Sequence, residues 1–136
     1  MKIVSKALVV DADNNVLLLR RSNTHPNFPN HVDFPGGEVE EGEQYIAAVQ
    51  REILEEIGAT VNAENIEQIY SKQLADDLLH VVFMAKLSDN DKPLKLSWEH
   101  SSCEWLPMAD FISMPLPEGV DSYHLTVLEY LKHAQN

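Results

Sequence analysis

Apolar and β-branched residues gather near the start of this chain in two short runs that are separated by polar residues. The first run spans residues 2–10 and the second spans residues 16–19. Between them lies Asp13-Asn14-Asn15, a sequence typical of a tight turn. The pattern therefore predicts two strands joined as a hairpin. Residues 22–32 hold two prolines and several polar side chains, which predicts a loop after the second strand.

The periodicity then changes to that of a helix. Isoleucine and valine recur three and four residues apart, at Ile46, Val49, Ile53 and Ile57. This spacing predicts an apolar stripe that faces a core. Gly58 follows the last of these residues and is a typical helix end, because glycine adopts the left-handed conformation there without strain.

The rest of the chain predicts three more strands and two more helices. Residues 61–73 and 78–87 predict two strands, and the second is apolar at successive positions, as in a strand covered on both faces. Residues 102–106 predict a short strand, 108–114 a short helix and 122–133 a final helix. Strands combined with one early and one terminal helix predict an α/β fold in which a sheet lies between helices.

Composition narrows the class of protein. The chain carries 22 Asp and Glu against 10 Lys and Arg, a net charge of −12, which disfavours duplex nucleic acid and anionic membranes as partners. A single cysteine, Cys103, excludes an internal disulfide. No apolar stretch has membrane-spanning length, and the first residues lack a signal-peptide core. We therefore expect a single domain over residues 1–136 and a cytoplasmic location.

Three acids of the predicted helix form the clearest candidate site. Glu52, Glu55 and Glu56 lie three and four residues apart, so they share one face, away from the apolar stripe. Like charges at this spacing cost a helix about 0.2–0.5 kcal/mol per pair. A hard cation such as Mg²⁺, which prefers oxygen ligands, offsets that repulsion. The alternative is an acidic face that only contacts solvent, as most charge runs do.

The sequence around these acids resembles the signature of the Nudix hydrolases, and in particular its MutT-like members. That signature is G-x₅-E-x₇-R-E-U-x-E-E-x-G-U, where U is a bulky aliphatic residue. Residues 37–59 match it at eight fixed positions, which are Gly37, Glu43, Arg51, Glu52, Ile53, Glu55, Glu56 and Gly58. The one departure is Ala59, which is smaller than the usual final residue. The resemblance implies the Nudix α/β/α sandwich, with a mixed sheet between helices.

The resemblance also implies a metal site. Glu52, Glu55 and Glu56 would bind Mg²⁺, or Mn²⁺ in its place, with the Gly36 carbonyl as a further ligand. Gly36 and Gly37 lack a Cβ atom, so they permit a tight turn with an exposed carbonyl near the phosphates of a substrate.

The remaining roles in the signature concern the arginine and the proton acceptor. By resemblance, Glu43 positions Arg51, which ties the loop to the helix as a scaffold. The proton acceptor differs among family members, and we favour Glu52 or Glu55. The runner-up is Glu99, because many Nudix enzymes carry a carboxylate on a loop before a strand that contains tryptophan. A solvated surface acid is the alternative interpretation of Glu99.

Candidate substrate contacts lie outside the signature. Arg20 and Arg21 end the second predicted strand, at a family position where basic residues often meet phosphate, although a salt bridge at the strand end fits equally well. Phe34 is a candidate stacking surface for a base, and its alternative is a core position, where most aromatic residues lie.

These expectations describe a Mg²⁺-dependent hydrolase that cleaves a diphosphate linkage in a nucleoside diphosphate derivative, or a nucleoside triphosphate pyrophosphohydrolase. The protein would act on a small nucleotide as a monomer or a homodimer. The alternative is a catalytically silent Nudix-fold sensor of a nucleotide or metabolite. Degenerate acids in the signature would favour the sensor, and here all of them are intact.

Overall fold

The computed structural model describes residues 1–24, 26, 32–88 and 94–113. Its secondary structure elements follow one another in the order β1 (Lys2–Val10), β2 (Asn15–Arg21), β3 (Val32–Asp33), β4 (Gly36–Glu38), α1 (Tyr45–Ile57), the 3-10 turn η1 (Ala63–Asn65), β5 (Ile66–Ala75), β6 (Leu78–Lys86), β7 (His100–Pro107) and α2 (Met108–Ser113). No helix in these ranges is long and apolar enough to cross a membrane.

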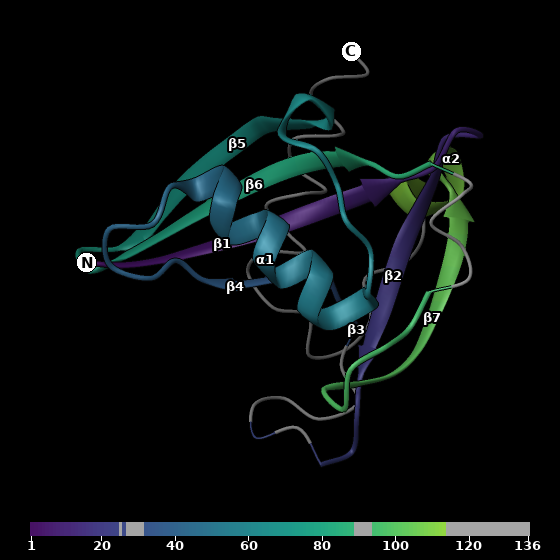
Figure 1. Ribbon diagram of the computed structural model, residues 1–136, viewed down its shortest axis with the longest axis horizontal. Coiled ribbons are helices and arrows are strands. Elements are labelled where there is room, and N and C mark those ends of the chain that lie inside the picture. The colour runs from purple at the N-terminus through teal and green to yellow at the C-terminus, as the bar shows by residue number, and fades with distance from the viewer. Residues whose placement is uncertain (25, 27–31, 89–93, 114–136) are drawn as a thin grey trace.

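The strands form a mixed sheet organised around β1. This strand runs parallel to β6 along its whole length, with Lys2 opposite Leu78 and Val10 opposite Lys86. β5 pairs antiparallel with β6 along the edge of β6 that does not contact β1. β4 pairs antiparallel with β1 along the edge of β1 that does not contact β6. β2 meets β1 only at its first residues and then pairs with β3 and β7. Figure 1 shows β2 and β7 splaying away from β1, β6 and β5.

Helix α1 lies across one face of this sheet (Figure 1). Val49, Ile53 and Ile57 are fully buried against it, and Ile46 is partly buried at the edge of the same core. Gly58 ends the helix with a φ of 72°, and its N–H donates to the Leu54 carbonyl at 3.0 Å. The sequence prediction of this helix, its apolar face and its glycine end is confirmed.

Alternate residues of β1 and β2 point to a second core on the opposite face. There Leu8, Leu18 and Val82 pack with Phe34 and with Phe111 of α2. Helices on both faces of a mixed sheet give the layering that the sequence predicted. The final helix predicted over residues 122–133 lies outside the described residues.

Three details differ from the sequence prediction. The hairpin of β1 and β2 is short, since only Val10 and Val16 pair across it before β2 turns toward β7. The strand expected to begin at residue 61 begins at Ile66, because η1 closes first with a hydrogen bond from the Asn65 N–H to the Asn62 carbonyl. Residues 36–38, expected as a turn, form a strand along β1.

Candidate active site

Residues 34–37, which we call the glycine turn, lead from β3 into β4 and bring the backbone of β4 directly against β1. Gly36 lies opposite Lys6 with a φ of 146°, in the region of backbone conformation that favours glycine. A Cβ atom there would lie only 2.7 Å from the Lys6 Cα, so no side chain fits. At Gly37 a Cβ atom would lie 2.7 Å from Oε1 of Glu52. The two glycines therefore leave room for close strand pairing and for a carboxylate of α1.

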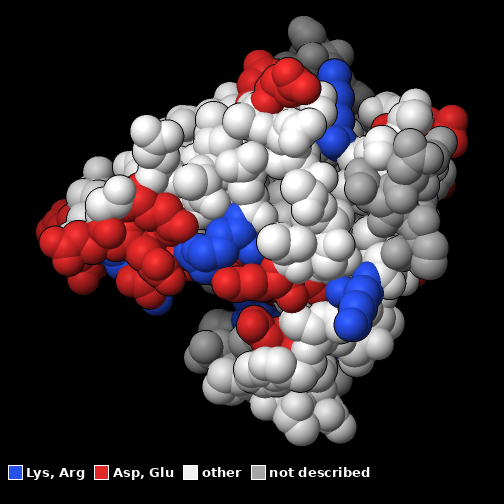
Figure 2. Space-filling view, viewed as in Figure 1, with Lys and Arg blue, Asp and Glu red and all other residues white. Residues whose placement is uncertain are grey.

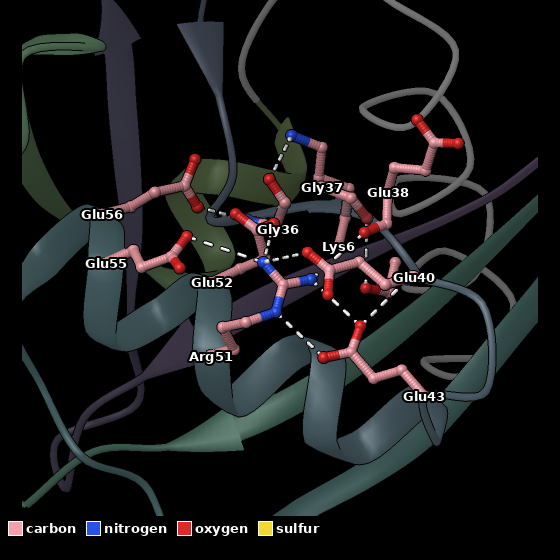
Figure 3. Close-up of polar contacts among 11 residues, drawn as sticks. Lys6, Gly36, Gly37, Glu38, Glu40, Glu43, Arg51, Glu52, Glu55 and Glu56 are labelled. Carbon is pink, nitrogen blue, oxygen red and sulfur yellow. Dashed lines mark hydrogen bonds and ion pairs between the residues drawn. The ribbon is translucent and has the colours of Figure 1, made fainter.

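Glu56 points from α1 into this turn. Its Oε2 accepts a hydrogen bond of 2.6 Å from the backbone N–H of Gly36, and only 3% of the residue is exposed. Burial raises the pKa of Glu56 to about 8, although the charge of Lys6 and the Gly36 N–H act in the opposite direction. Of the three helix acids, Glu56 is therefore an inward-facing group, held by the backbone of the turn (Figure 3).

Arg51 lies at the centre of the remaining acids (Figure 3). Its Nε and Nη2 donate to the two oxygens of Glu43 at 2.9 and 3.0 Å. Its Nη1 donates to Glu52 at 2.9 Å and lies 3.6 Å from Glu55. Nη2 also donates to the Glu38 carbonyl at 3.3 Å. The pairing of Arg51 with Glu43 predicted from the sequence is present, and it joins the loop before α1 to the helix.

Glu52 and Glu55 occupy different environments. Glu52 is partly buried beside Gly37, and burial raises its pKa while the charge of Arg51 lowers it. The Glu55 side chain is 59% exposed. Figure 2 shows that acidic surface gathers on this face of the molecule, with basic side chains between the acids. The two carboxylates are thus held by one shared arginine while remaining accessible from the same side.

The candidate ligands have the chemistry of a divalent metal site. All four candidate ligands, the carboxylates of Glu52, Glu55 and Glu56 and the Gly36 carbonyl, are hard oxygen donors of the kind Mg²⁺ prefers. Within the described ranges, however, no group of three or more His, Cys, Asp or Glu side chains is already gathered around one point. The acids instead contact Arg51 and the Gly36 N–H. The residue types fit a divalent cation, and binding requires these carboxylates to exchange their present partners for it.

A buried network of charges lies behind the turn. Lys6, Arg21, Asp33 and His100 are each at most 5% exposed. Asp33 accepts from Lys6 Nζ at 3.1 Å, and its other oxygen lies 3.2 Å from Arg21 Nε and 3.0 Å from His100 Nε2. Burial raises the pKa of Asp33, but Lys6, His100 and Arg21 together hold it well below its ordinary range. The network joins β1, β2, β3 and β7 directly beneath the turn.

The three residues predicted to contact substrate lie in different environments. Arg21 is buried beside Asp33, which is the salt-bridge alternative, and it does not face solvent. Phe34 is fully buried, with its ring edge-on to Phe111 at 5.9 Å, so its assignment as a stacking surface is corrected to a core position. Arg20 is exposed and lines a pocket of about 200 Å³ with Ser102 and Glu104 of β7. Arg20 alone remains a candidate for contact with phosphate.

Glu99 lies in the turn that precedes β7. Its carbonyl accepts from the Ser22 N–H at 2.8 Å, and its residue is partly buried. The same segment is tied to the end of α1, because the Ser97 N–H donates to the Glu56 carbonyl at 2.9 Å. Glu99 therefore occupies a loop attached to the acid-bearing helix, and its role as an alternative proton acceptor stays a prediction.

Sequence reasoning missed Lys6 and Asp33. A signal for Lys6 was present, since it is a charged residue within the apolar run 2–10. Asp33 directly precedes the Phe34-Pro35-Gly36-Gly37 turn, but its partners come from distant strands. The structure also places His100 in the buried network, where its Nε2 lies 3.0 Å from Oδ2 of Asp33.

The fold and the site together define a class, that of α/β proteins in which a glycine turn meets an acidic helix on a mixed sheet. A family model described as the NUDIX domain matches residues 2–130, and the chain belongs to this family. The family acts on nucleoside diphosphate derivatives and generally uses divalent cations.

Two curated relatives share part of the chain. The ADP-ribose pyrophosphatase of Methanocaldococcus jannaschii is 35% identical over 81 residues, which cover 60% of this chain and 47% of that protein. The prenyl-diphosphate phosphatase of Methanosarcina mazei is 28% identical over 108 residues, which cover 78% of this chain and 64% of that protein. The matched segments thus span less than two thirds of either relative.

Two solved structures have the same fold. The MutT protein of Methanosarcina mazei Go1 superposes with a TM-score of 0.76 at 26% identity, and the match covers 99% of this chain and 96% of that one. The NUDIX domain of Shewanella oneidensis NrtR, solved with ADP ribose, gives a TM-score of 0.71 at 25% identity, covering 98% of this chain and 88% of that one. These matches confirm the Nudix α/β fold that the signature implied.

Proposed function

We propose that this protein is a Mg²⁺-dependent hydrolase that cleaves the diphosphate linkage of a nucleoside diphosphate derivative. The observation that carries the proposal is the meeting of the helix acids with the glycine turn. Glu56 is fixed by the Gly36 N–H at 2.6 Å, while Glu52 and Glu55 lie beside it on the same helix and share Arg51. Such a set offers carboxylates for a cation together with the backbone carbonyl of Gly36.

Glu52, Glu55, Glu56 and the Gly36 carbonyl would hold the metal. A bound divalent cation neutralises phosphate oxygens and lowers the pKa of a coordinated water. The residues of the chain supply the rest. The proton of the attacking water passes to a carboxylate, for which Glu52 or Glu55 is favoured and Glu99 is the alternative. The oxygen of water forms a bond to phosphorus as the bridging P–O bond breaks. Arg20, which is exposed on β2, is the candidate for contact with a phosphate group.

ADP-ribose is the substrate that the comparisons favour for a first test. It is named in the activity of one curated relative and is bound in one structural neighbour. It is also a nucleoside diphosphate linked to another group, which is the class proposed here. A prenyl diphosphate is the rival, because it belongs to the relative that matches more of the chain.

The test is a panel of purified compounds: ADP-ribose, a prenyl diphosphate, a nucleoside triphosphate and a dinucleoside tetraphosphate. Each is incubated with the protein in Mg²⁺ and, in parallel, in EDTA, and the products are separated and identified. Cleavage of ADP-ribose to AMP and ribose phosphate in Mg²⁺ alone is the expected result. Complete inactivity toward every compound in both Mg²⁺ and Mn²⁺ would contradict the proposal.

A binding module is the second candidate, because one matched NUDIX domain was solved with ADP ribose bound. The two functions are separated by comparing binding with turnover on the same sample. Calorimetry that shows tight ADP-ribose binding, without any product after long incubation in Mg²⁺, would favour the sensor. The intact acids of the signature favour the enzyme.

A further inference from the structure

Lys6 is a buried cation that the proposed chemistry does not use. It lies on β1, outside the Nudix signature, and only 5% of it is exposed. Burying an ammonium group is costly unless it is paired and hydrogen-bonded. An apolar residue would serve a purely structural position on this strand equally well, since its neighbours Val4 and Leu8 on the same face are apolar. The presence of a charge here therefore needs a cause.

The contacts of Lys6 show what its side chain holds. Nζ donates to Oδ1 of Asp33 at 3.1 Å, to the carbonyl of Phe34 at 3.2 Å and to the carbonyl of Gly36 at 3.3 Å. The three N–H donors of an ammonium group match these acceptors in number. The next residue adds a backbone bond, from the Ala7 N–H to the Pro35 carbonyl at 2.8 Å. Each of the residues 33–36 therefore accepts a hydrogen bond from Lys6 or Ala7 of β1.

Gly36 links this cation to the acids of the helix. Its carbonyl accepts from Lys6 and its N–H donates to Glu56 at 2.6 Å (Figure 3). Gly36 is therefore bonded to Lys6 through its carbonyl and to Glu56, a proposed metal ligand, through its N–H. Any loss of the Lys6 contact frees the turn to shift, and the Gly36 N–H would move relative to Glu56.

The charges of the buried network also connect Lys6 to the helix acids. Lys6 and Arg21 carry two positive charges, and both contact the single negative charge of Asp33. The network therefore retains positive charge behind the turn. Lys6 also acts as a nearby positive charge on Glu52 and Glu56. A positive group behind the turn offsets repulsion among acids that must approach one another around a cation.

We propose that Lys6 is a positioning residue of the metal site, which fixes the turn at Gly36 so that Glu56 and the Gly36 backbone are placed for the cation. The proposal rests on the proposed function for its catalytic consequence, but its effect on metal binding can be measured without any substrate. Lys6 does not contact the substrate in this assignment. It acts through Gly36.

The experiment compares Lys6→Met with a control of similar burial. Met preserves length and removes the donors and the charge. The control is Val82→Ala, which changes the fully buried register partner of Lys6 on β6. It lowers stability by loosening the core that includes Phe34, but it removes no charge and no hydrogen-bond donor that reaches Gly36. Mg²⁺ affinity is measured by calorimetry in the absence of nucleotide. We expect Lys6→Met to weaken Mg²⁺ binding by about 10-fold or more, and Val82→Ala to change it less than about 2-fold.

Three further readouts separate positioning from general destabilisation. In saturating Mg²⁺, kcat should fall in Lys6→Met while KM stays within about 2-fold of the original, because Lys6 does not contact substrate. The Gly36 amide signal in a ¹⁵N–¹H spectrum should shift and exchange faster with solvent. Lys6→Arg, which keeps the cation and its donors, should retain most of the Mg²⁺ affinity. If Lys6→Met does not fold, Lys6→Gln is used, with an expected loss of affinity in the same direction.

The outcomes are distinguishable. Equal Mg²⁺ affinity and equal kcat in the unaltered protein and in Lys6→Met would overturn the role of Lys6 and leave the hydrolase intact. Equal loss of affinity in Lys6→Met and Val82→Ala would also overturn it, since both losses would then follow from stability. Mg²⁺ binding without hydrolysis of any compound would overturn the proposed function, while the affinity comparison still decides the role of Lys6.

Discussion

The carboxylate of Glu56 accepts a hydrogen bond from the backbone N–H of Gly36, a residue twenty positions earlier in the chain, at 2.6 Å. This bond joins the acid-bearing helix to the glycine turn and is buried. It places one of the three helix acids in the interior, whereas Glu55 remains at the surface. The acids that the sequence groups together therefore differ in environment, and variants of each have different expected consequences.

Replacing Glu56 by Gln should reduce kcat by about 10²-fold or more, because it removes a charged ligand while keeping the shape of the side chain. Glu55→Gln should act in the same direction. Activity is measured on the best compound of the panel in Mg²⁺, and folding is checked by circular dichroism. Glu64→Gln, at an exposed acid of η1, is the matched control and should leave kcat unchanged. Near-normal turnover in both active-site variants would refute the assignment of these acids.

Addition of Mg²⁺ should raise the melting temperature. A ligand that binds only the folded state at 100 times its Kd adds about 2.7 kcal/mol of stability, which corresponds to roughly 5–15 °C for a domain of this size. Relief of repulsion among the helix acids contributes to the effect. Thermal unfolding is followed in Mg²⁺ and in a sodium salt of equal ionic strength. Identical curves in the two salts would rule out a specific cation site.

Gly36→Ala should be far more damaging than Gly42→Ala. At Gly36 a methyl group would meet the Lys6 Cα at 2.7 Å, whereas at Gly42 no atom lies within 4 Å of the added Cβ. Both residues have positive φ, so each substitution costs about 1–2 kcal/mol of backbone strain. The clash at Gly36 adds about 1–3 kcal/mol. Denaturant titration of both variants measures the difference, and equal free energies of unfolding would show that the strands are not as tightly apposed as described.

Acid should destabilise the protein through His80. The pKa of His80 is lowered from 6.5 to about 4, mainly by burial and in addition by the charges of Lys6 and Lys2. Between these values the unfolded chain binds the proton more readily than the folded one. The contribution to stability is therefore complete above pH 6.5 and is lost as the pH falls toward 4, by at most about 1.4 kcal/mol per pH unit.

The measurement is the free energy of unfolding of the original protein minus that of His80→Gln, taken in EDTA between pH 4 and 7. This difference should decrease as the pH falls. Glu56 has a raised pKa, so it destabilises the folded state as the pH rises from 4.5 through about 8, but it is present in both proteins and cancels. A difference that does not vary with pH would mean that His80 takes up its proton equally easily in both states.

Much of the fold was predictable because its signals are local. The apolar runs of β1 and β6, the stripe on α1 and the Gly58 end depend on residues close together in sequence. The buried network was not predictable in the same way. Asp33 meets Lys6 across 27 residues and His100 across 67, and a lone charged residue in sequence carries no information about such a partner. The burial of Phe34 and Arg21 follows from the same long-range packing.

The candidate site shows the same division. Spacing alone placed the three glutamates on one helix face. The pairing of Arg51 with Glu43 was implied by the resemblance to the Nudix signature, and it is present in the structure. Spacing could not show that Glu56 turns inward, since that depends on how β4 approaches β1. The direction of each carboxylate is set by tertiary contacts, whereas its presence is set by sequence.

Because one guanidinium is shared by Glu43, Glu52 and Glu55, these acids compete for a common partner. Deleting any one of them releases Arg51 to draw more strongly on the others, so the consequences of single substitutions will not sum. If proton acceptors are ranked from single substitutions, the loss of a proton acceptor cannot be told apart from a change in the ion pairs of Arg51. Double substitutions of these acids, each made both with Arg51 present and with Arg51 replaced, separate the two effects.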